Sequence, residues 1–314
     1  MTTPILVTGA NGFLARHLLE ALKATSSCTI IGTDVQAMPR WAKDLDGYQQ
    51  ADFTSQLEIE ALLKRWQPSQ VFHLAGLNKG SAWDLFAVNT LGTVGLLEGI
   101  LKIVPKTRVL HIGSAAEYGP VTQDRLPVRE DQSCRPLGAY GVSKHAATLA
   151  ALDLARRTGL YVIVARLFNL VGAGIPGDLV IGAFLERARS ALAATNGYPV
   201  VQMGRLDAKR DFLAVEDAAS GCIQLMEAGS SGDVVNLCSG VPMEVKYLVR
   251  KLCSFSSVPI RVEVSPGLVI AKEVSVIYGD LTRARTMLGF TPRVPIEKAL
   301  QSAWDYAMAS GVNQ

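Results

Sequence analysis

The stretch TGANGFLA, residues 8–15, joins a short apolar run to an amphipathic helical pattern close to the N-terminus. Gly9 can make a tight turn, and Gly12 lets backbone N–H groups approach a pyrophosphate at the positive end of the next helix. Ala15, at the third small position, permits close packing of helix on strand. This order of strand, glycine turn and helix is typical of a dinucleotide-binding fold. The cofactor contacts predicted here are Gly9, Asn11, Gly12, Phe13 and Leu14.

Short apolar runs alternate with helical patterns through the first half of the chain. The strands expected are 5–9, 29–34, 48–53, 71–76, 108–114 and 161–167, and the helices 12–24, 55–66, 83–102 and 138–157. This alternation predicts an α/β fold with a doubly wound parallel sheet of the Rossmann type. Glycine and proline cluster in NLVGAGIPGD, where a smaller C-terminal substrate-binding lobe is expected to begin. The predicted division is 1–168 for the dinucleotide-binding domain, with 205–228 returning to it, and 169–314 mainly for the second lobe.

Two acids follow the second and third expected strands. Asp34 lies about twenty residues beyond the glycine turn, where an acid can accept both ribose hydroxyls of an adenosine. Its carboxylate would repel a 2′-phosphate, so NAD is predicted over NADP; NADP stays open because Arg40 could moderate this preference. A solvated turn aspartate is the alternative interpretation. Asp52, followed by Phe53, is a weaker candidate for contact with the adenine.

The bulk composition does not suggest a nucleic-acid or membrane surface. The 314 residues carry 31 Lys and Arg against 28 Asp and Glu, a net charge of +3, and the basic residues are scattered. The five cysteines form no CxxC pair and are expected to be free thiols. No signal peptide and no apolar run of the roughly 18 residues that span a bilayer is recognised. We expect a cytoplasmic protein that binds neither nucleic acid nor membrane, and no metal ion.

A tyrosine and a lysine stand four residues apart in AYGVSKHA, residues 139–146. On a helix, Tyr140 and Lys144 would leave the same face one turn apart. A phenol ionises near pH 10, and an ammonium group one turn away favours its charged form. The spacing also arises by chance, so two unrelated residues on one helix remain the alternative.

Six motifs follow one another along the chain: TGANGFLA, VFHLAG, GSAAEYG, YGVSK, ARLFN and RDFLAVED. With them the chain, from residue 4 to about 305, resembles the extended short-chain dehydrogenase/reductase family of nucleotide-sugar epimerases, dehydratases and reductases. The resemblance implies that Tyr140 is the acid/base and that Lys144 lowers its pKa and holds the nicotinamide ribose. It also implies that Ser114 donates a hydrogen bond to the substrate oxygen.

The resemblance extends to further contacts and to a partner. It implies that Leu74, Ala75, Gly76 and Asn89 lie on the cofactor side, although Asn89 could equally serve helix packing. It implies that Ala115, Asn169 and Arg210 meet a nucleotide-sugar substrate; a guanidinium suits a diphosphate. Helices 83–102 and 138–157 resemble those of the family's dimer interface, so a homodimer is expected.

Two alanines bear on the reaction. The family's sugar dehydratases carry acids after the Ser or Thr, whereas Ala115 and Ala116 stand here and cannot transfer protons. The motifs are most similar to those of GDP-4-keto-6-deoxy-mannose reductases, which implies NAD(P)H-dependent reduction of a nucleotide-linked 4-keto-6-deoxy sugar, with Tyr140 as proton donor. Those reductases carry an arginine where Ile270 and Lys272 stand, which leaves the nucleotide base open. The alternatives are an NAD-dependent nucleotide-sugar 4-epimerase and a catalytically silent NAD(H)-sensing protein.

Overall fold

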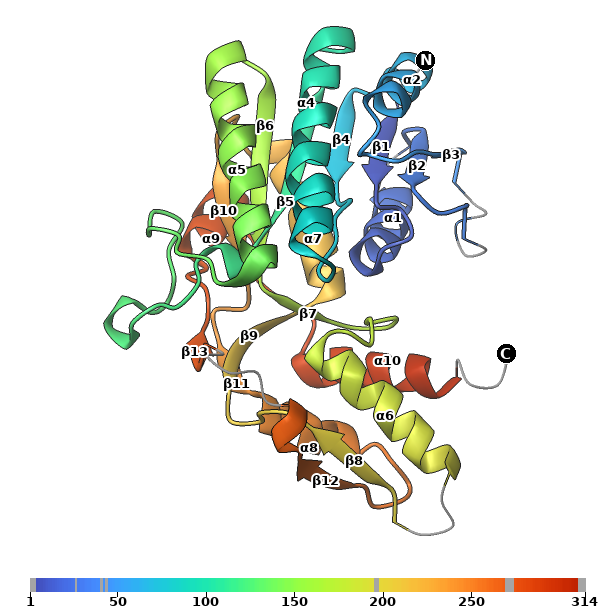
Figure 1. Cartoon of the computed structure of the whole chain (residues 1–314), viewed down its shortest axis with the longest axis vertical. Helices are drawn as coiled ribbons and strands as arrows, with labels where there is room; N and C mark the ends of the chain where they lie inside the picture. The colour runs from blue at the N-terminus through green and yellow to red at the C-terminus, as the bar shows by residue number, and fades with distance from the viewer. Residues whose placement is uncertain are drawn as a thin grey trace.

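A parallel sheet forms the larger part of the molecule (Figure 1). The computed structural model describes residues 4–25, 27–39, 42, 45–194, 198–268 and 274–309. Within them, the sheet has seven strands in the order β10–β6–β5–β4–β1–β2–β3. The strands are Ile5–Thr8 (β1), Ile30–Asp34 (β2), Gly47–Gln50 (β3), Gln70–His73 (β4), Arg108–Ser114 (β5), Tyr161–Leu167 (β6) and Val234–Leu237 (β10). The predicted α/β fold with a doubly wound Rossmann sheet is confirmed.

Helices cover both faces of this sheet, as parallel strands require. One face carries Phe13–Thr25 (α1), Val215–Ala228 (α7) and Thr282–Leu288 (α9), and the other carries Gln56–Trp66 (α2), Gly92–Ile103 (α4) and Gly138–Thr158 (α5). All four residues of β1 are buried, which agrees with its apolar run over residues 5–7. The strand order reverses between β1 and β4, and such a switch point opens a crevice at the carboxyl ends of the strands.

The helix expected over 83–102 is interrupted by a π-helical turn. Ala82–Leu85 (α3) begins with a capping box in which Ser81 and Asp84 exchange hydrogen bonds, and Phe86–Leu91 (η2) then leads into α4. The wider turn places Asn89 in the interior, where it is 1% exposed. π-helical turns of this kind are frequent at functional sites.

The continuous helical stretch Ala82–Ile103 is long and apolar enough, by length and composition alone, to cross a bilayer. It is not an uninterrupted apolar run in the sequence, because it contains Asn89, Thr90 and Thr93. Leu96, Leu97 and Ile100 of this stretch are buried in a core cluster that also contains residues of α2 and α5. A core helix of a globular domain can have the same length and composition, so this feature alone is weak evidence for a membrane span.

The smaller lobe lies beyond the carboxyl ends of the large sheet (Figure 1). Its strands are Asn169–Val171 (β7), Val200–Met203 (β8), Lys209–Ala214 (β9), Pro242–Glu244 (β11), Arg261–Val264 (β12) and Val276–Ile277 (β13). Val180–Ala194 (α6), Val245–Cys253 (α8) and Ile296–Ala309 (α10) pack around a separate core. Strands β7 and β9 pair in parallel, and β7 lies close to the carboxyl ends of the large sheet (Figure 1).

The return to the large sheet differs from the expected 205–228: residues 209–214 form β9 of the smaller lobe, and the return begins with α7 at Val215 and extends beyond 228. Helix α7 packs against α1, and β10 pairs in parallel with β6. Helix α9 then packs against β10. Strand β10, expected in the second lobe, instead completes the first because Val235 and Leu237 fill its core cluster.

Candidate active site

The turn between β1 and α1 forms a backbone cradle. Gly9 has a φ of +65°, and a Cβ there would lie 2.8 Å from the backbone N and Cα of Ala75. The Gly12 N–H donates to the Gly9 carbonyl oxygen at 2.9 Å, which closes the turn just before α1 begins at Phe13. A side chain at Gly9 is therefore excluded by strain and by contact. This bare turn at a helix N-terminus fits the pyrophosphate of a dinucleotide.

Asp34 stands beside this cradle at the end of β2. Its carboxylate oxygens accept the backbone N–H groups of Asn11 at 3.1 Å and Gln36 at 3.0 Å. The Tyr48 hydroxyl donates to the Gln36 carbonyl oxygen at 2.6 Å, and burial, then the charge of Asp34, raises the pKa of Tyr48 to about 12. The acid is thus held next to the glycine turn, where an adenosine ribose fits. Arg40 lies outside the described residues.

The second acid is engaged locally. Asp52 accepts hydrogen bonds from the N–H and the hydroxyl of Thr54, both at 2.8 Å on the same carboxylate oxygen. Phe53 beside it is buried and packs toward Gly92 of α4. This is the pattern of an Asx turn that starts a helix, so the adenine contact predicted for Asp52 stays a prediction.

The segment after β4 is fixed by buried polar side chains. The Thr8 hydroxyl oxygen accepts the N–H groups of Leu74 and Ala75 at 3.1 and 3.0 Å, and it contacts His73 Nδ1 at 2.8 Å. Burial, then the charge of Lys144, lowers the pKa of His73 to about 3, so this ring is neutral at physiological pH.

Asn89 continues this support toward α5. Its side chain accepts from the Leu77 N–H at 2.7 Å and donates to the Leu77 carbonyl oxygen at 2.8 Å. The same amide nitrogen donates to the Ser143 hydroxyl at 3.0 Å. Asn89 therefore ties the backbone beside Gly76 to the helix that carries Tyr140 and Lys144.

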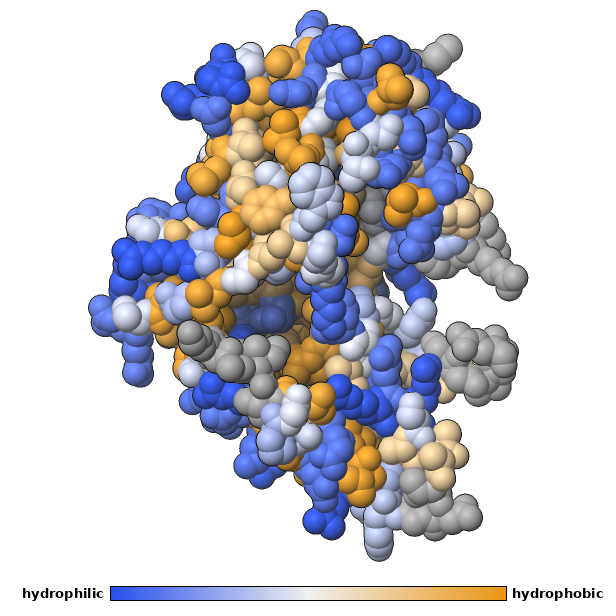
Figure 2. Space-filling model, viewed as in Figure 1, coloured by the Kyte–Doolittle hydropathy of each residue, from blue (hydrophilic) through white to orange (hydrophobic). Residues whose placement is uncertain are grey.

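A cavity of about 730 Å³ opens between the two lobes, and Figure 2 shows the hollow on the viewed face. It brings together more than half of the predicted site residues: Phe13, Leu74, Gly76, Asn89, Ser114, Ala115, Tyr140, Lys144, Asn169 and Arg210. Its wall does not include Gly9, Asn11, Gly12, Leu14, Asp34, Asp52, Phe53 or Ala75. The cavity therefore joins the predicted catalytic and substrate residues, and the glycine cradle lies to one side.

Tyr140 and Lys144 leave α5 one turn apart, and Ser114, which ends β5, hydrogen-bonds with the Tyr140 side chain. Burial raises the pKa of Tyr140; a hydrogen bond with the Ser114 side chain lowers it, and the charge of Glu117 raises it. Burial lowers the pKa of Lys144 to about 8, against the charge of Glu117, which raises it. The phenol is thus protonated at neutral pH.

The far wall of the cavity comes from the smaller lobe. The Asn169 side-chain amide donates to the Asp211 carbonyl oxygen at 2.8 Å, which joins β7 to β9. Arg210 donates to the carbonyl oxygens of Lys209 and Ser275 at 3.0 and 3.3 Å. Both side chains line the cavity about which the two lobes meet. Ile270 and Lys272 lie outside the described residues.

Two further polar residues that line the cavity were missed from the sequence. The Asn78 amide, after β4, donates to the Asp178 carboxylate, before α6, at 2.5 Å. Both line the cavity, and 100 positions separate them in the chain. No local pattern marks such a pair, because only the packing of one lobe on the other brings it together.

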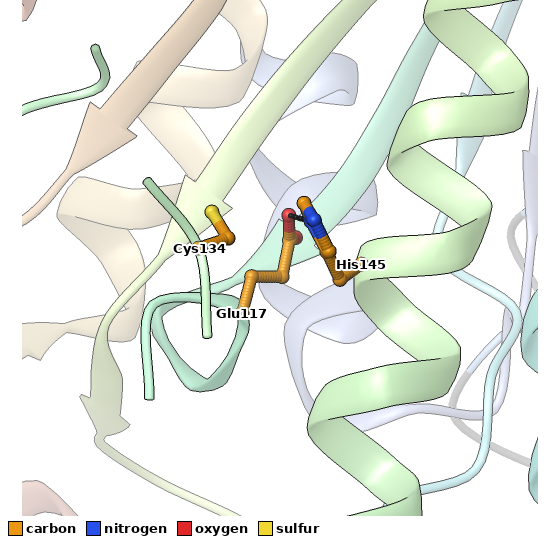
Figure 3. A group of neighbouring side chains, drawn as sticks. All are labelled: Glu117, Cys134 and His145. Carbon is orange, nitrogen blue, oxygen red and sulfur yellow. Dashed lines mark ion pairs between the residues drawn. The ribbon is translucent and has the colours of Figure 1, made fainter. Parts of the chain in front are cut away.

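Glu117 was not predicted as a site residue, and it faces away from the cavity. It is buried beside Cys134 and His145, and the ligand atoms of these three side chains lie within 4.8 Å of one another (Figure 3). Arg166 Nε donates to the Glu117 Oε2 atom at 3.0 Å, so a cation already occupies the approach that a metal ion would need. The S-x-x-E spacing from Ser114 to Glu117 is a capping-box signal that could have found it.

Comparison with known proteins agrees with this geometry. Residues 5–238 match the NAD dependent epimerase/dehydratase family. The chain is 30% identical to the GDP-6-deoxy-D-mannose reductase of Pseudomonas aeruginosa, over 96% of each chain. It is 29% identical to the dTDP-6-deoxy-L-talose 4-dehydrogenase (NAD(P)(+)) of Kitasatospora kifunensis, over 96% of this chain and 94% of that one.

A solved structure has the same overall form. The structure of RMD from Pseudomonas aeruginosa complexed with NADPH superposes with a TM-score of 0.85 at 26% identity, covering 98% of this chain and 100% of that one. The match to the family spans the glycine cradle, the Tyr140 and Lys144 helix and strand β10. The chain is therefore an NAD(P)-dependent enzyme that belongs to the NAD dependent epimerase/dehydratase family, of the extended short-chain dehydrogenase/reductase type.

Proposed function

We propose that this enzyme reduces a nucleotide-linked 4-keto-6-deoxy sugar with NAD(P)H and that Tyr140 donates the proton. The observation that carries the proposal is the meeting of Ser114, Tyr140 and Lys144 in a cavity whose far wall holds Arg210. The two relatives named above support the substrate class, since each is named for a nucleotide-linked 6-deoxy sugar. One name specifies a GDP-linked sugar and the other a dTDP-linked sugar, so the proposal does not specify the nucleotide base.

The residues divide the work of the reaction. Ser114 and Tyr140 bind the keto oxygen, and Tyr140, protonated at neutral pH, gives its proton as that oxygen becomes a hydroxyl. Lys144 compensates the negative charge that this transfer leaves on the phenol oxygen. Bound NAD(P)H supplies the hydride. Ala115 and Ala116 offer no acid for elimination, so the keto sugar must arrive ready-made.

The cofactor is held by the cradle and the acid beside it. Gly9, Gly12 and the N-terminus of α1 hold the pyrophosphate, and Asp34 accepts the ribose hydroxyls. We propose a preference for NADH over NADPH, because a 2′-phosphate would meet the Asp34 carboxylate. The solved relative is complexed with NADPH, so this preference is a point at which the two proteins would differ.

The decisive experiment follows NADH absorbance with purified enzyme and a nucleotide-linked 4-keto-6-deoxy sugar, using GDP- and dTDP-linked forms in parallel. We expect one NADH oxidised for each sugar reduced, and no oxidation without the keto sugar. Interconversion of two 4-hydroxy sugar nucleotides with no net change in NADH would establish the epimerase instead. NAD(H) binding without turnover of any of these sugars would favour a sensing protein.

We also propose that the enzyme forms a homodimer through the helical stretch 82–103 and α5. Both present large apolar side chains to solvent, among them Trp83, Leu91, Val142 and Leu149. Figure 2 shows apolar surface over α4 and α5 on the viewed face. A second copy of the chain would cover this face as a two-helix-on-two-helix contact, which is self-complementary in a two-fold dimer.

Light scattering during size-exclusion chromatography tests the dimer. The wild type should elute with twice the chain mass, and the double variant Leu91→Glu, Leu149→Glu with the mass of one chain. Val264→Glu is the matched control, since Val264 is as exposed as Leu149 but lies on β12 of the smaller lobe. A monomeric wild type, or equal dissociation in the control, would overturn the assignment of this face.

A further inference from the structure

Glu117 is a buried carboxylate that joins three elements around the catalytic residues. It is 0% exposed, and its Oε1 atom accepts the Ser114 backbone N–H at 2.8 Å and the Thr148 hydroxyl of α5 at 3.1 Å. Its Oε2 atom accepts Arg166 Nε of β6 at 3.0 Å. One side chain thus links the end of β5, helix α5 and strand β6.

The neighbouring residues enclose this carboxylate closely. His145 Nδ1, on α5, lies 3.6 Å from Glu117 Oε2, and Figure 3 shows the acid between this ring and Cys134. Gly113 gives it room, since a Cβ at that position would lie 2.5 Å from Glu117 Oε1. A carboxylate enclosed in this way has few rotamers open to it, so it can fix the groups that bond to it.

Ser114 depends on this acid for its geometry. Ser114 and Glu117 form a capping box over the short 3₁₀ turn Ala115–Glu117 (η3), in which the Ser114 hydroxyl accepts the Ala116 N–H at 3.2 Å. Thr148 stands one turn beyond Lys144 on α5. The distance between Ser114 and the Tyr140 helix is therefore set through the Glu117 carboxylate.

We propose that Glu117 is a positioning residue of the reaction, which holds Ser114 against the helix that carries Tyr140 and Lys144. This role rests on the proposed function, because Ser114 and Tyr140 are the groups that meet the keto oxygen there. A displacement of about 1 Å between reacting groups costs on the order of 100-fold in rate. Loss of Glu117 should accordingly lower kcat and leave NADH binding unchanged, because the Gly9 cradle and Asp34 do not touch it.

The charge of Glu117 gives the proposal a second readout. This charge raises the pKa of Tyr140, whereas the hydrogen bond with Ser114 lowers it. Removal of Glu117 and removal of the Ser114 hydroxyl should thus shift this pKa in opposite directions. Other titratable and charged groups surround Glu117 and Tyr140. They are Lys144 and His145 on α5, Arg166 on β6, Cys134 on the loop before α5, His73 on β4 and His111 on β5.

The test compares Glu117→Gln, Ser114→Ala and Asp217→Asn in the full chain. Asp217 is the matched control, a carboxylate that is 6% exposed and accepts the backbone N–H groups of Arg293 and Val294, away from the cavity. The Tyr140 pKa is followed by NMR of protein labelled with ¹³C at the tyrosine phenolic carbon, and Tyr140→Phe identifies the signal. This titration needs no substrate.

We expect the Tyr140 pKa to fall in Glu117→Gln, to rise in Ser114→Ala and to stay unchanged in Asp217→Asn. With the keto sugar, kcat of Glu117→Gln should fall by about 10–100-fold while the Kd of NADH changes less than about twofold. An unchanged Tyr140 pKa in Glu117→Gln, or an equal loss of kcat in Asp217→Asn, would overturn the proposal.

Two provisions keep the outcome interpretable. If Glu117→Gln does not fold because it leaves Arg166 buried without its partner, the double variant Glu117→Gln, Arg166→Gln removes both charges together. The Tyr140 pKa is expected to fall there by less, because the opposing charge of Arg166 is removed as well, and a pKa that does not fall counts against the proposal. If the wild type reduces no keto sugar, the reaction proposed above fails, whereas the NMR titration still decides the role of Glu117.

Discussion

At the cofactor end of the cavity a tight backbone turn forms the cradle, whereas at the substrate end a side-chain contact joins residues that are far apart in the sequence. The Gly9 to Gly12 turn spans four positions, and Asp34 bonds to Asn11 and Gln36. At the other end, Asn78 bonds to Asp178 across 100 positions. A local backbone turn recognises what dinucleotides share, and side chains assembled from distant segments can vary the substrate without disturbing that turn.

The largest effect is expected from a change at Tyr140, which lies where the cofactor end and the substrate end of the cavity meet. Tyr140→Phe keeps the ring and removes the proton, so we expect kcat to fall by about 10²–10⁴-fold while NADH and sugar nucleotide bind as before. Stopped-flow measurement of NADH oxidation, with separate titrations of each ligand, tests this. Retention of most of the activity on the keto sugar would exclude Tyr140 as the proton donor.

A change at the cofactor end should affect one ligand alone. Asp34→Ala removes the proposed acceptor of the ribose hydroxyls and the proposed repulsion of a 2′-phosphate. We expect NADH to bind about 10–100-fold more weakly and the preference over NADPH to disappear, with the KM of the sugar unchanged. Calorimetric titration with both cofactors measures the effect. Equal binding of NADH and NADPH by the wild type would show that Asp34 does not select the cofactor.

The same comparison explains what the sequence could predict. The glycine turn, Asp34 and the Tyr140–Lys144 pair are local patterns, so their places along the strands and helices could be predicted from spacing alone. Asn78 and Asp178 carry no pattern until the lobes pack together. Strand β10 was assigned to the wrong lobe because a buried apolar strand looks the same in either sheet.

Glu117 combines a local sequence pattern with contacts to elements that only the fold brings together. Its S-x-x-E spacing from Ser114 is local, yet its partners Thr148 and Arg166 come from elements separated by the fold. A capping box could be predicted from the sequence, but the burial of its acid against an arginine could not. The interruption of the helix over 83–102 was hidden for the same reason, because the π-helical turn serves Asn89 and its contacts with Leu77 and Ser143.

A change at the substrate end should affect the sugar nucleotide alone, just as Asp34→Ala should affect the cofactor alone. Arg210→Ala removes a guanidinium proposed to contact the diphosphate in ground state and transition state alike, so KM for the sugar nucleotide should rise about tenfold with kcat nearly unchanged. NADH binding should not change. Arg261→Ala is the control, because that arginine pairs with Glu263 on the exposed strand β12. A fall in kcat with KM unchanged would place Arg210 at the reacting atoms instead.

The smallest effect expected is on stability and concerns Lys144, whose charge is proposed to serve the reaction but is costly to bury. Burial lowers the pKa of Lys144 to about 8 in the folded chain, below its ordinary value in the unfolded one. The unfolded chain therefore binds more protons between pH 8 and about 10.4, so the cost is full below pH 8 and fades as the pH rises through this window.

Lys144→Met should consequently unfold a few °C higher than the wild type at pH 7, with the difference shrinking toward pH 10, while activity is lost. Thermal unfolding of the ligand-free protein at both pH values tests this, and Lys246→Met, on the exposed face of α8, should show no such pH-dependent gain. A lower unfolding temperature for Lys144→Met at pH 7 would mean that its contacts outweigh the cost of burying its charge, and that this cationic centre between the two ends of the cavity stabilises the fold as well as the reaction.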